Sequence, residues 1–187
     1  MKQFITRRSF IKAAGAATAL TAVSVGAPAA FAEETNCFFG DKADVTILYT
    51  NDVHTYIDNK SPKPTYAAIA ALKKSIEDTG RDVLLVDAGD HIQGTAYGSM
   101  DDGATIIELM NAVGYDIAIP GNHEFDYGME NFLELTKQAN FPYISANFTC
   151  RDELVFAPYV IKEFDGVKIA FVGMTTPNTI TSSTPVY

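Results

Sequence analysis

Residues 118–128 read AIPGNHEFDYG, a stretch in which a short apolar run gives way to glycine, asparagine, histidine and two acids. The run from Asp116 to Gly121 has the composition of a buried strand, and a segment with helical periodicity follows at 129–140. A glycine such as Gly121 lets the backbone turn sharply where a strand ends. The stretch therefore predicts a strand, a polar loop and a helix, which together form the repeating unit of α/β proteins.

The same unit recurs along the chain. From about Asp44 onward, short apolar runs alternate with segments of helical periodicity, which is typical of an α/β layered domain. The predicted strands are 44–50, 82–89, 116–121 and 142–148, the predicted helices are 65–80, 104–114 and 129–140, and a hairpin turning at Asp165 and Gly166 is predicted for 159–174. The polar segment after Met174 has no periodicity, so we expect a loop there.

The composition describes a chain that can bury a core. Its 187 residues are 47% hydrophobic and 20% charged, which suits one ordinary domain and excludes disordered and collagen-like classes. The net charge of -9 leaves no basic surface for a phosphate backbone, so a nucleic acid polymer is not an expected partner. A small phosphorylated substrate remains compatible, because bound cations can reverse the local sign of the charge.

The first 32 residues differ from the rest of the chain. TRRSFIK (6–12) leads into a stretch rich in small residues and ends in APAAFA (27–32), the pattern of a twin-arginine export signal. Cleavage after Ala32 would remove four basic residues and no acid, changing the net charge from -9 to -13. The apolar part, 13–25, is shorter than the roughly 20 residues of a membrane span. We expect membrane contact only during export, and a periplasmic, extracellular or cell-surface location.

The number and spacing of the cysteines do not decide whether the protein contains a disulfide. Cys37 and Cys150 are the two cysteines of the chain. An exported protein can join such a pair in a disulfide, but nothing in their spacing requires one.

Polar side chains follow three predicted strands at their carboxyl ends. In chain order they are Asp52, His54, Asp90, Asn122, His123 and Asp126. Each group alone is compatible with an ordinary turn or a helix cap. The carboxyl ends of neighbouring parallel strands lie at one edge of a sheet, where ligands bind, so three such loops favour a shared site.

These residue types suit a metal centre. Asp and Asn oxygens with His nitrogens form a site for zinc, manganese, iron or cobalt, and one carboxylate can bridge two ions. Two ions roughly 3.5–4 Å apart form the clamp that hydrolyses phosphate esters.

The motifs NDVH (51–54), GDHIQG (89–94) and GNHEFDYG (121–128), in this order, resemble the calcineurin-like metallophosphoesterases, and specifically the secreted 5'-nucleotidase and UDP-sugar hydrolase family. The resemblance implies a four-layer α/β/β/α metallophosphoesterase sandwich, incomplete in this chain, with a dinuclear metal centre at the loop edge. Residues 1–32 would be the signal peptide and 33–187 the N-terminal portion of the metallophosphoesterase domain.

The resemblance also implies ligand roles. Asp52 and His54 would bind the first divalent metal ion, Asp90 would bridge both ions, and Asn122 would bind the second. The protein would be a metal-dependent phosphoric ester hydrolase in which a metal-activated water attacks phosphorus in line, without a covalent enzyme intermediate.

In the same resemblance, His123 is the catalytic imidazole, which donates to the phosphoryl or leaving oxygen, and Asp126 orients and charges it. Three neighbours receive plainer interpretations. We expect Asp87 to brace the loop from within its strand, His91 to be a partly exposed loop residue, and Glu124 to lie beside the site or face solvent.

The chain lacks part of the family's ligand set. The second metal of the family needs two downstream histidines and the first needs one more side chain, whereas this chain has three histidines in all: His54, His91 and His123. We therefore expect the N-terminal part of a longer protein, or a truncated product, without the C-terminal domain that recognises the substrate. That substrate would be a small nucleotide or nucleotide-sugar.

Three hypotheses for function follow. The first is an exported dinuclear phosphoesterase of the 5'-nucleotidase type, which needs the missing ligands for full activity. The second is a non-catalytic fragment that binds at most one metal, through Asp52, His54 and Asp90. The third is a thiosulfohydrolase-like member, which ranks lower because GNHEFDYG and FPYISANF (141–148) are more similar to nucleotidases.

Overall fold

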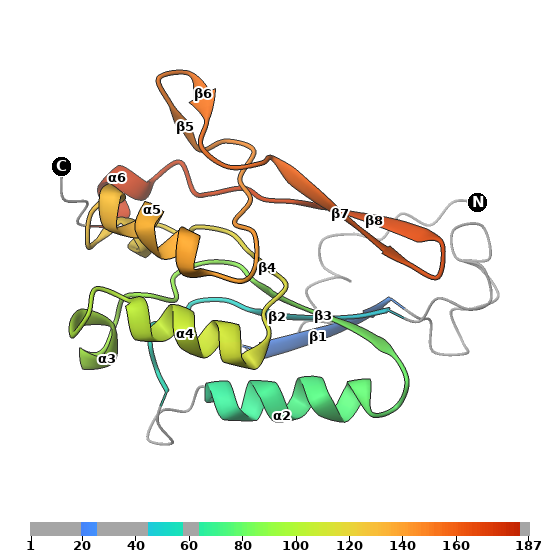
Figure 1. The fold of residues 1–187 in the computed structure, drawn as a ribbon. Coiled ribbons are helices and arrows are strands. Elements are labelled where there is room, and N and C mark those ends of the chain that lie inside the picture. Colours follow the sequence, from blue (N-terminus) through green and yellow to red (C-terminus); the bar gives the residue numbers. More distant parts are fainter. Residues whose placement is uncertain (1–19, 26–44, 58–63, 184–187) are drawn as a thin grey trace, which may run out of the picture.

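The central sheet of the protein has four strands (Figure 1). The structure is a computed structural model, and it describes residues 20–25, 45–57 and 64–183. In spatial order the strands are β1 (Leu20–Val25), β2 (Val45–Thr50), β3 (Asp82–Asp87) and β4 (Ile117–Ala118). Strands β2, β3 and β4 are parallel, and β1 is antiparallel to β2. The carboxyl ends of β2, β3 and β4 therefore lie at one edge of the sheet.

Three longer helices connect and cover these strands. They are α2 (Tyr66–Glu77), α4 (Ala104–Val113) and α5 (Met129–Gln138). Shorter helical segments are α3 (Ala96–Ser99), the 3₁₀ turn η1 (His123–Phe125) and α6 (Thr179–Ser182). Among the described residues, none of the helices combines the length and apolar character needed to cross a membrane.

Helix α2 shows how the sequence sets the ends of a helix. The Thr65 side chain accepts a hydrogen bond from the backbone N–H of Ala68 at 3.2 Å, which satisfies a free donor of the first turn. Gly80 follows the helix at φ +82°, a left-handed conformation that glycine adopts without strain. The predicted helix is confirmed, and Tyr66 and Ile69 are buried as the periodicity requires.

The two faces of the central sheet pack on different partners. Leu48, Leu85 and Ala118 belong to a core cluster with the three longer helices. Leu84 and Ile117, on the opposite face, form a second cluster with Ile144. Alternate residues of the strands thus serve two layers, as buried strands require.

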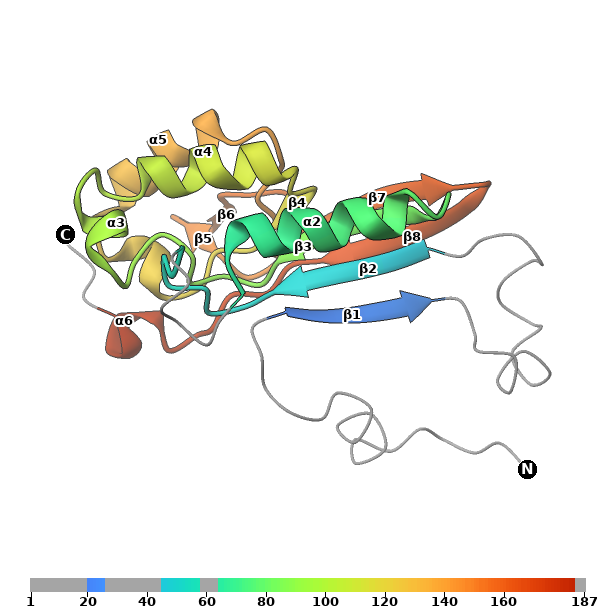
Figure 2. The ribbon, with the colours of Figure 1, turned by 90° about the horizontal axis from the view of Figure 1, so that it is seen from below.

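The second cluster is covered by the hairpin of β7 (Tyr159–Phe164) and β8 (Val167–Val172), which lies across the central sheet from α2 in Figures 1 and 2. The predicted turn is confirmed, because Asp165 and Gly166 both have positive φ angles. The outer hairpin face exposes 53% of Tyr159, 52% of Ile161 and 60% of Val172. The described part of the chain therefore forms three layers of the predicted α/β/β/α sandwich.

The predicted strand 142–148 is wrong as a continuous strand. Tyr143 makes an isolated bridge to Ala118, and the next residue, Ile144, makes one to Ala157. Further along, the backbone N–H of Ala146 donates to Gly173. The segment changes partner at almost every residue as it passes between the central sheet and the hairpin, so no ladder can form.

Other elements were not predicted. Strand β1 lies inside the segment expected to be an export signal, and its β-branched sequence LTAVSV suits pairing along the otherwise open edge of β2. A small hairpin of β5 (Thr149–Cys150) and β6 (Glu153–Leu154) follows the irregular segment. The last described residues, expected to be a loop, include the single turn of α6. Predicted strand 116–121 forms a ladder only over the two residues of β4.

Candidate metal centre

Three loops meet at the carboxyl edge of the central sheet. Beyond the end of β2, the backbone N–H of Asp52 donates to Gly89 at 3.1 Å and that of His54 donates to Asp90 at 2.9 Å. The first two loops therefore stay paired after their strands end. The third loop joins them where the N–H of His123 donates to Asp90 Oδ1 at 2.8 Å. The predicted convergence of the three strand ends is observed.

His54, Asp90 and His123 form one cluster of possible ligands. One ligand atom of each lies within 4.8 Å of the others, a spacing that suits a metal ion. The rings of the two histidines meet edge to face, with 5.2 Å between their centroids. Three of the six predicted site residues, one from each loop, are thus brought together.

The other two predicted ligands lie at the border of this cluster. Asp52 Oδ1 is 3.7 Å from His54 Nε2, and the side chain of Asp52 is 52% exposed. The amide nitrogen of Asn122 donates to the Ser182 carbonyl at 3.0 Å, which holds that side chain against the C-terminal segment. The ligand roles of both residues remain predictions.

Three predicted ligands have strained backbones. Asp52, His54 and Asp90 have φ angles of +54°, +49° and +61°, the left-handed region that side chains other than glycine seldom adopt. Such residues cost about 1–3 kcal/mol each and concentrate at functional sites. Nothing in the residue pattern indicates this strain.

A pair of threonines holds the first strained loop in place. The Thr55 hydroxyl accepts the backbone N–H of Thr95 at 2.7 Å, and the Thr95 hydroxyl donates to the Thr55 carbonyl at 3.1 Å. Thr55 is itself at φ +56°, which is unusual for a β-branched residue. The loop that carries His54 is therefore fixed to the loop that follows Asp90.

Gly121 is required by close approach rather than by a turn, which corrects the expectation from sequence. Gly121 is absent from the described residues with positive φ. A Cβ atom at this position would overlap Asp90 Oδ1 and would lie 2.6 Å from the Asp90 nitrogen. Only glycine leaves room for the Asp90 carboxylate beside this loop.

The orientation of His54 fits a metal ligand. Its Nδ1–H donates to the Gln93 carbonyl at 3.1 Å, because a carbonyl oxygen can only accept. This bond fixes the tautomer and leaves Nε2 with its lone pair. Histidine ligands in metal sites are held in the same way.

His123 and Asp126 form the predicted pair. His123 Nδ1 lies 2.7 Å from Asp126 Oδ2, and the two side chains are 28% and 11% exposed. Burial by itself lowers the pKa of His123, but the hydrogen bond and charge of Asp126, with the charges of Asp90 and Glu124, outweigh it and raise the pKa above its usual value. The geometry suits an imidazole that donates a proton, although its catalytic role remains a prediction.

Negative charge is crowded around Asp90. Burial raises the pKa of its carboxyl, the hydrogen bond from the His123 backbone lowers it, and the charge of Glu124 with a hydrogen bond to Asp52 raises it further, so the net shift is upward. A cation bound between these groups would relieve the repulsion. The residues therefore fit a divalent ion.

His91 is not the partly exposed loop residue expected from the sequence. Its side chain is fully buried, with Nδ1 2.7 Å from Asp87 Oδ1 and Nε2 2.8 Å from the Tyr143 hydroxyl. Burial alone lowers its pKa, but the charges of Glu124 and Asp87, with the hydrogen bond to Asp87 and the charge of Asp90, raise the pKa to about 9. A charged ring donates from both nitrogens, which explains both contacts.

Asp87 braces the loop, as predicted. Its Oδ1 accepts the backbone N–H of Gly89 at 2.9 Å, and its Oδ2 accepts the Thr50 hydroxyl. Of the two positions expected for Glu124, beside the site or facing solvent, the structure shows the first, because its side chain is fully buried and accepts the backbone N–H of Asp90 at 2.8 Å. The sequence did not predict that Asp87, His91 and Glu124 would form one buried polar layer.

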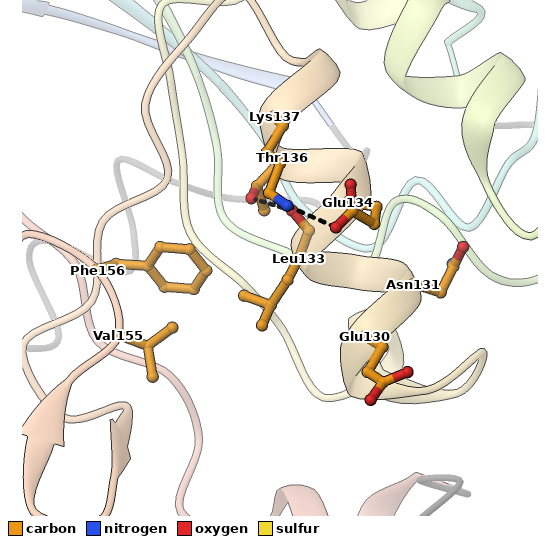
Figure 3. Close-up of a pocket in the computed structure, with 8 residues that line it drawn as sticks. All are labelled: Glu130, Asn131, Leu133, Glu134, Thr136, Lys137, Val155 and Phe156. Carbon is orange, nitrogen blue, oxygen red and sulfur yellow. Dashed lines mark hydrogen bonds and ion pairs between the residues drawn. The ribbon is translucent and has the colours of Figure 1, made fainter.

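Two further features lie away from the cluster. An open groove of about 680 Å³ is lined by α5 residues between Glu130 and Lys137 and by Val155 and Phe156, which face Leu133 across it (Figure 3). It shares no residue with the candidate metal centre. Cys150 is exposed in β5, and because Cys37 lies outside the described residues, their pairing remains a prediction.

The fold and the site define a class of protein. Residues 45–181 match the model of the calcineurin-like phosphoesterase family, and the chain belongs to this family. Residues 5–24 match the signal sequence of the twin-arginine translocation pathway, which directs export across a membrane. The predicted family is confirmed.

Relatives within the family are similar over the same part of the chain. A snake venom 5'-nucleotidase from Gloydius brevicauda is 35% identical in an alignment 159 positions long, which covers 76% of this chain and 27% of that protein. The crystal structure of a 5'-nucleotidase precursor from Thermus thermophilus is 31% identical with a TM-score of 0.68, over 76% of this chain and 30% of that chain. The NAD nucleotidase of Haemophilus influenzae is 31% identical with a TM-score of 0.65, over 75% and 28%. The chain thus spans less than a third of the length of these proteins.

Proposed function

We propose that residues 33–187 form the N-terminal portion of the metallophosphoesterase domain of an exported enzyme of the 5'-nucleotidase type. It would hydrolyse the phosphate esters of small nucleotides or nucleotide-sugars outside the cytoplasm, in the periplasm or at the cell surface. The observation that carries this proposal is the meeting of His54, Asp90 and His123 from three loops at one sheet edge. The names of relatives at 31–35% identity support the nucleotide substrate class.

Two divalent ions are proposed as cofactors. Asp52 and His54 would hold the first, Asp90 would lie between the two, and Asn122 would hold the second. Carboxylate, amide and imidazole donors suit zinc, manganese, iron or cobalt. Bound there, the ions would lower the pKa of water and neutralise charge on the phosphoryl oxygens.

The remaining chemistry would belong to His123 and Asp126. Asp126 holds Nδ1 of the imidazole at 2.7 Å, so Nε2 is the nitrogen that can reach a substrate. In this role the ring would donate to the phosphoryl or leaving oxygen as negative charge develops there. The raised pKa of His123 suits a proton donor near neutral pH.

A second candidate function is a chain that binds one ion without turnover. The size of the cluster favours this candidate, because the side chains of His54, Asp90 and His123 can supply ligands for a single ion. The two candidates differ in the number of bound ions and in turnover, so the same two measurements test both.

The test compares two proteins that start at Glu33, namely this chain and the longest product that its reading frame encodes. Each is loaded with Mn²⁺ or Co²⁺, and bound metal and phosphate release from AMP are measured. We expect two ions and chelator-sensitive hydrolysis in a product that carries the downstream ligands, with Asp90→Ala as the inactive control. A metal-loaded longer product that leaves AMP and other nucleotides intact would contradict the phosphoesterase proposal. If this chain, starting at Glu33, binds two ions and hydrolyses AMP without any downstream residues, the single-ion candidate is excluded.

A further inference from the structure

Glu124 occupies an unusual position beneath the site. Its carboxylate is fully buried, and each hydrogen bond that it accepts from the described part of the chain comes from a backbone N–H. Oε2 accepts from Asp90 at 2.8 Å and from Gly121 at 2.6 Å. Oε1 accepts from His91 at 2.8 Å and more weakly from Ile92 at 3.4 Å. One side chain thus satisfies four donors.

The donors belong to two loops that carry predicted site residues. Asp90, His91 and Ile92 follow β3, whereas Gly121 precedes Asn122 after β4. The contact also runs in the opposite direction, since Asp90 Oδ1 accepts the backbone N–H of His123 at 2.8 Å. Each loop therefore contributes a carboxylate that binds backbone N–H groups of the other.

A carboxylate is the one side-chain end group that suits this arrangement. Both oxygens act only as acceptors when the group is ionised, which matches a shell made of donors. The isosteric amide of Gln would place an NH₂ group against at least one pair of backbone N–H groups. His91 Nδ1, 3.4 Å from Oε1, adds a positive partner that makes the buried charge tolerable.

A simpler interpretation is that Glu124 only satisfies free N–H groups at the start of η1. Gly121 fits that interpretation, because it lies three residues before Glu124. The bond to Asp90 does not, because that residue is 34 positions away in the chain and belongs to another loop. The cross-loop bonds fix a distance between loops, which a local cap would not do.

We infer that Glu124 is a positioning residue for the metal centre, which holds the Asp90 loop and the Asn122–His123 loop at the spacing that the bound ion requires. The inference rests on the proposed function, because it presumes that Asp90 binds a cation. Partners of this kind, one step removed from the metal, typically change metal affinity or activity by about 10–100-fold when they are altered.

The experiment compares Glu124→Gln with Glu130→Gln in the chain without its signal. Glu130 is exposed in the first turn of α5, so its variant makes the same change of charge without touching the loops. The probe is Co²⁺, whose visible absorption reports the arrangement of its ligands. Circular dichroism establishes that each variant is folded.

We expect Glu124→Gln to weaken Co²⁺ binding by about 10–100-fold and to alter the absorption of the bound ion, while Glu130→Gln changes neither. Equal affinity and an identical spectrum in the two variants would overturn the inference. A folded Glu124→Gln chain with weaker binding and an altered spectrum supports positioning over a general loss of structure.

A second measurement, on the wild-type chain, tests the inference even if Glu124→Gln does not fold. In the metal-free wild-type chain, hydrogen exchange at the amides of Asp90 and Gly121 should be as slow as in the core, because both donate to Glu124. Exchange as fast as in open loops would overturn the inference without any variant. If the wild-type chain binds no Co²⁺ but these amides are protected, the premise that Asp90 binds a cation in this chain fails, while the link between the loops stands.

Discussion

Two histidine–carboxylate pairs in this protein have the same contact distance and different surroundings. In both pairs a histidine Nδ1 lies 2.7 Å from a carboxylate oxygen. His91 and Asp87 are 0% and 1% exposed, whereas His123 and Asp126 are 28% and 11% exposed. The second nitrogen of His91 is bound to Tyr143, while the ring of His123 lies in the cluster of possible metal ligands.

The difference shows that the pair itself does not define a function. A buried pair with both nitrogens engaged can only hold the structure together, because no proton can reach a substrate. A partly exposed pair leaves one nitrogen able to contact a substrate, while the carboxylate sets the orientation of the ring. We therefore expect the pair of His91 to stabilise the fold and, under the proposed function, the pair of His123 to take part in catalysis.

The largest expected effect on stability comes from the buried pair. Asp87→Asn removes the nearer of the two carboxylates that face the buried His91, since Glu124 Oε1 lies farther away at 3.4 Å, and it should lower the free energy of unfolding by about 3–5 kcal/mol. Chemical denaturation of the metal-free chain measures this. A loss below about 1 kcal/mol would mean that His91 finds another partner and that the pair is not the brace of the loop.

A smaller loss of stability is expected at Tyr143, which contacts the second nitrogen of His91. Tyr143→Phe keeps the ring in the core but removes the hydroxyl that lies 2.8 Å from Nε2 of the buried His91, which should cost about 1–3 kcal/mol. The same denaturation series measures it, with Tyr159→Phe on the exposed hairpin face as a control expected to change stability little. Equal losses in the two variants would contradict the role of the Tyr143 hydroxyl.

The partly exposed pair of His123 and Asp126 should contribute least to stability. Asp126→Asn is expected to lower the free energy of unfolding by less than about 1 kcal/mol, since solvent screens a partly exposed pair. Turnover by an active, metal-loaded product should nevertheless fall, because the imidazole loses its orienting anion. A large loss of stability with unchanged turnover would reverse the division between the two pairs.

The meeting of the three strand ends could be predicted from the sequence, whereas the buried surroundings of these loops could not. Asp52, His54, Asp90 and His123 follow strand ends, and parallel pairing of β2, β3 and β4 is sufficient to bring those ends together. Burial of His91 could not be predicted in this way, because it depends on Tyr143, 52 residues later, and on the loop that carries Glu124. Local polarity suggested exposure, whereas tertiary contacts buried the ring.

Segment 142–148 illustrates a similar limit. Its composition is that of a strand, and its backbone is indeed hydrogen-bonded to neighbouring segments. Whether those bonds form one ladder depends on how the central sheet and the hairpin lie relative to each other. The spacing of apolar residues in the sequence carries no information about that arrangement. The strained φ angles of Asp52, His54 and Asp90 are likewise imposed by contacts between loops.

The most direct test of these roles is the number of ions bound by His123→Ala. His123 lies in one cluster with His54 and Asp90, so the geometry alone would allow it to be a ligand. Bound metal is measured by mass spectrometry in the longest product of the reading frame, with Asp90→Ala as the variant expected to empty the site. We predict that His123→Ala keeps the wild-type metal content and loses about 10²–10⁴-fold in AMP turnover. Loss of metal from His123→Ala would show that His123 is a ligand and would contradict its role as proton donor.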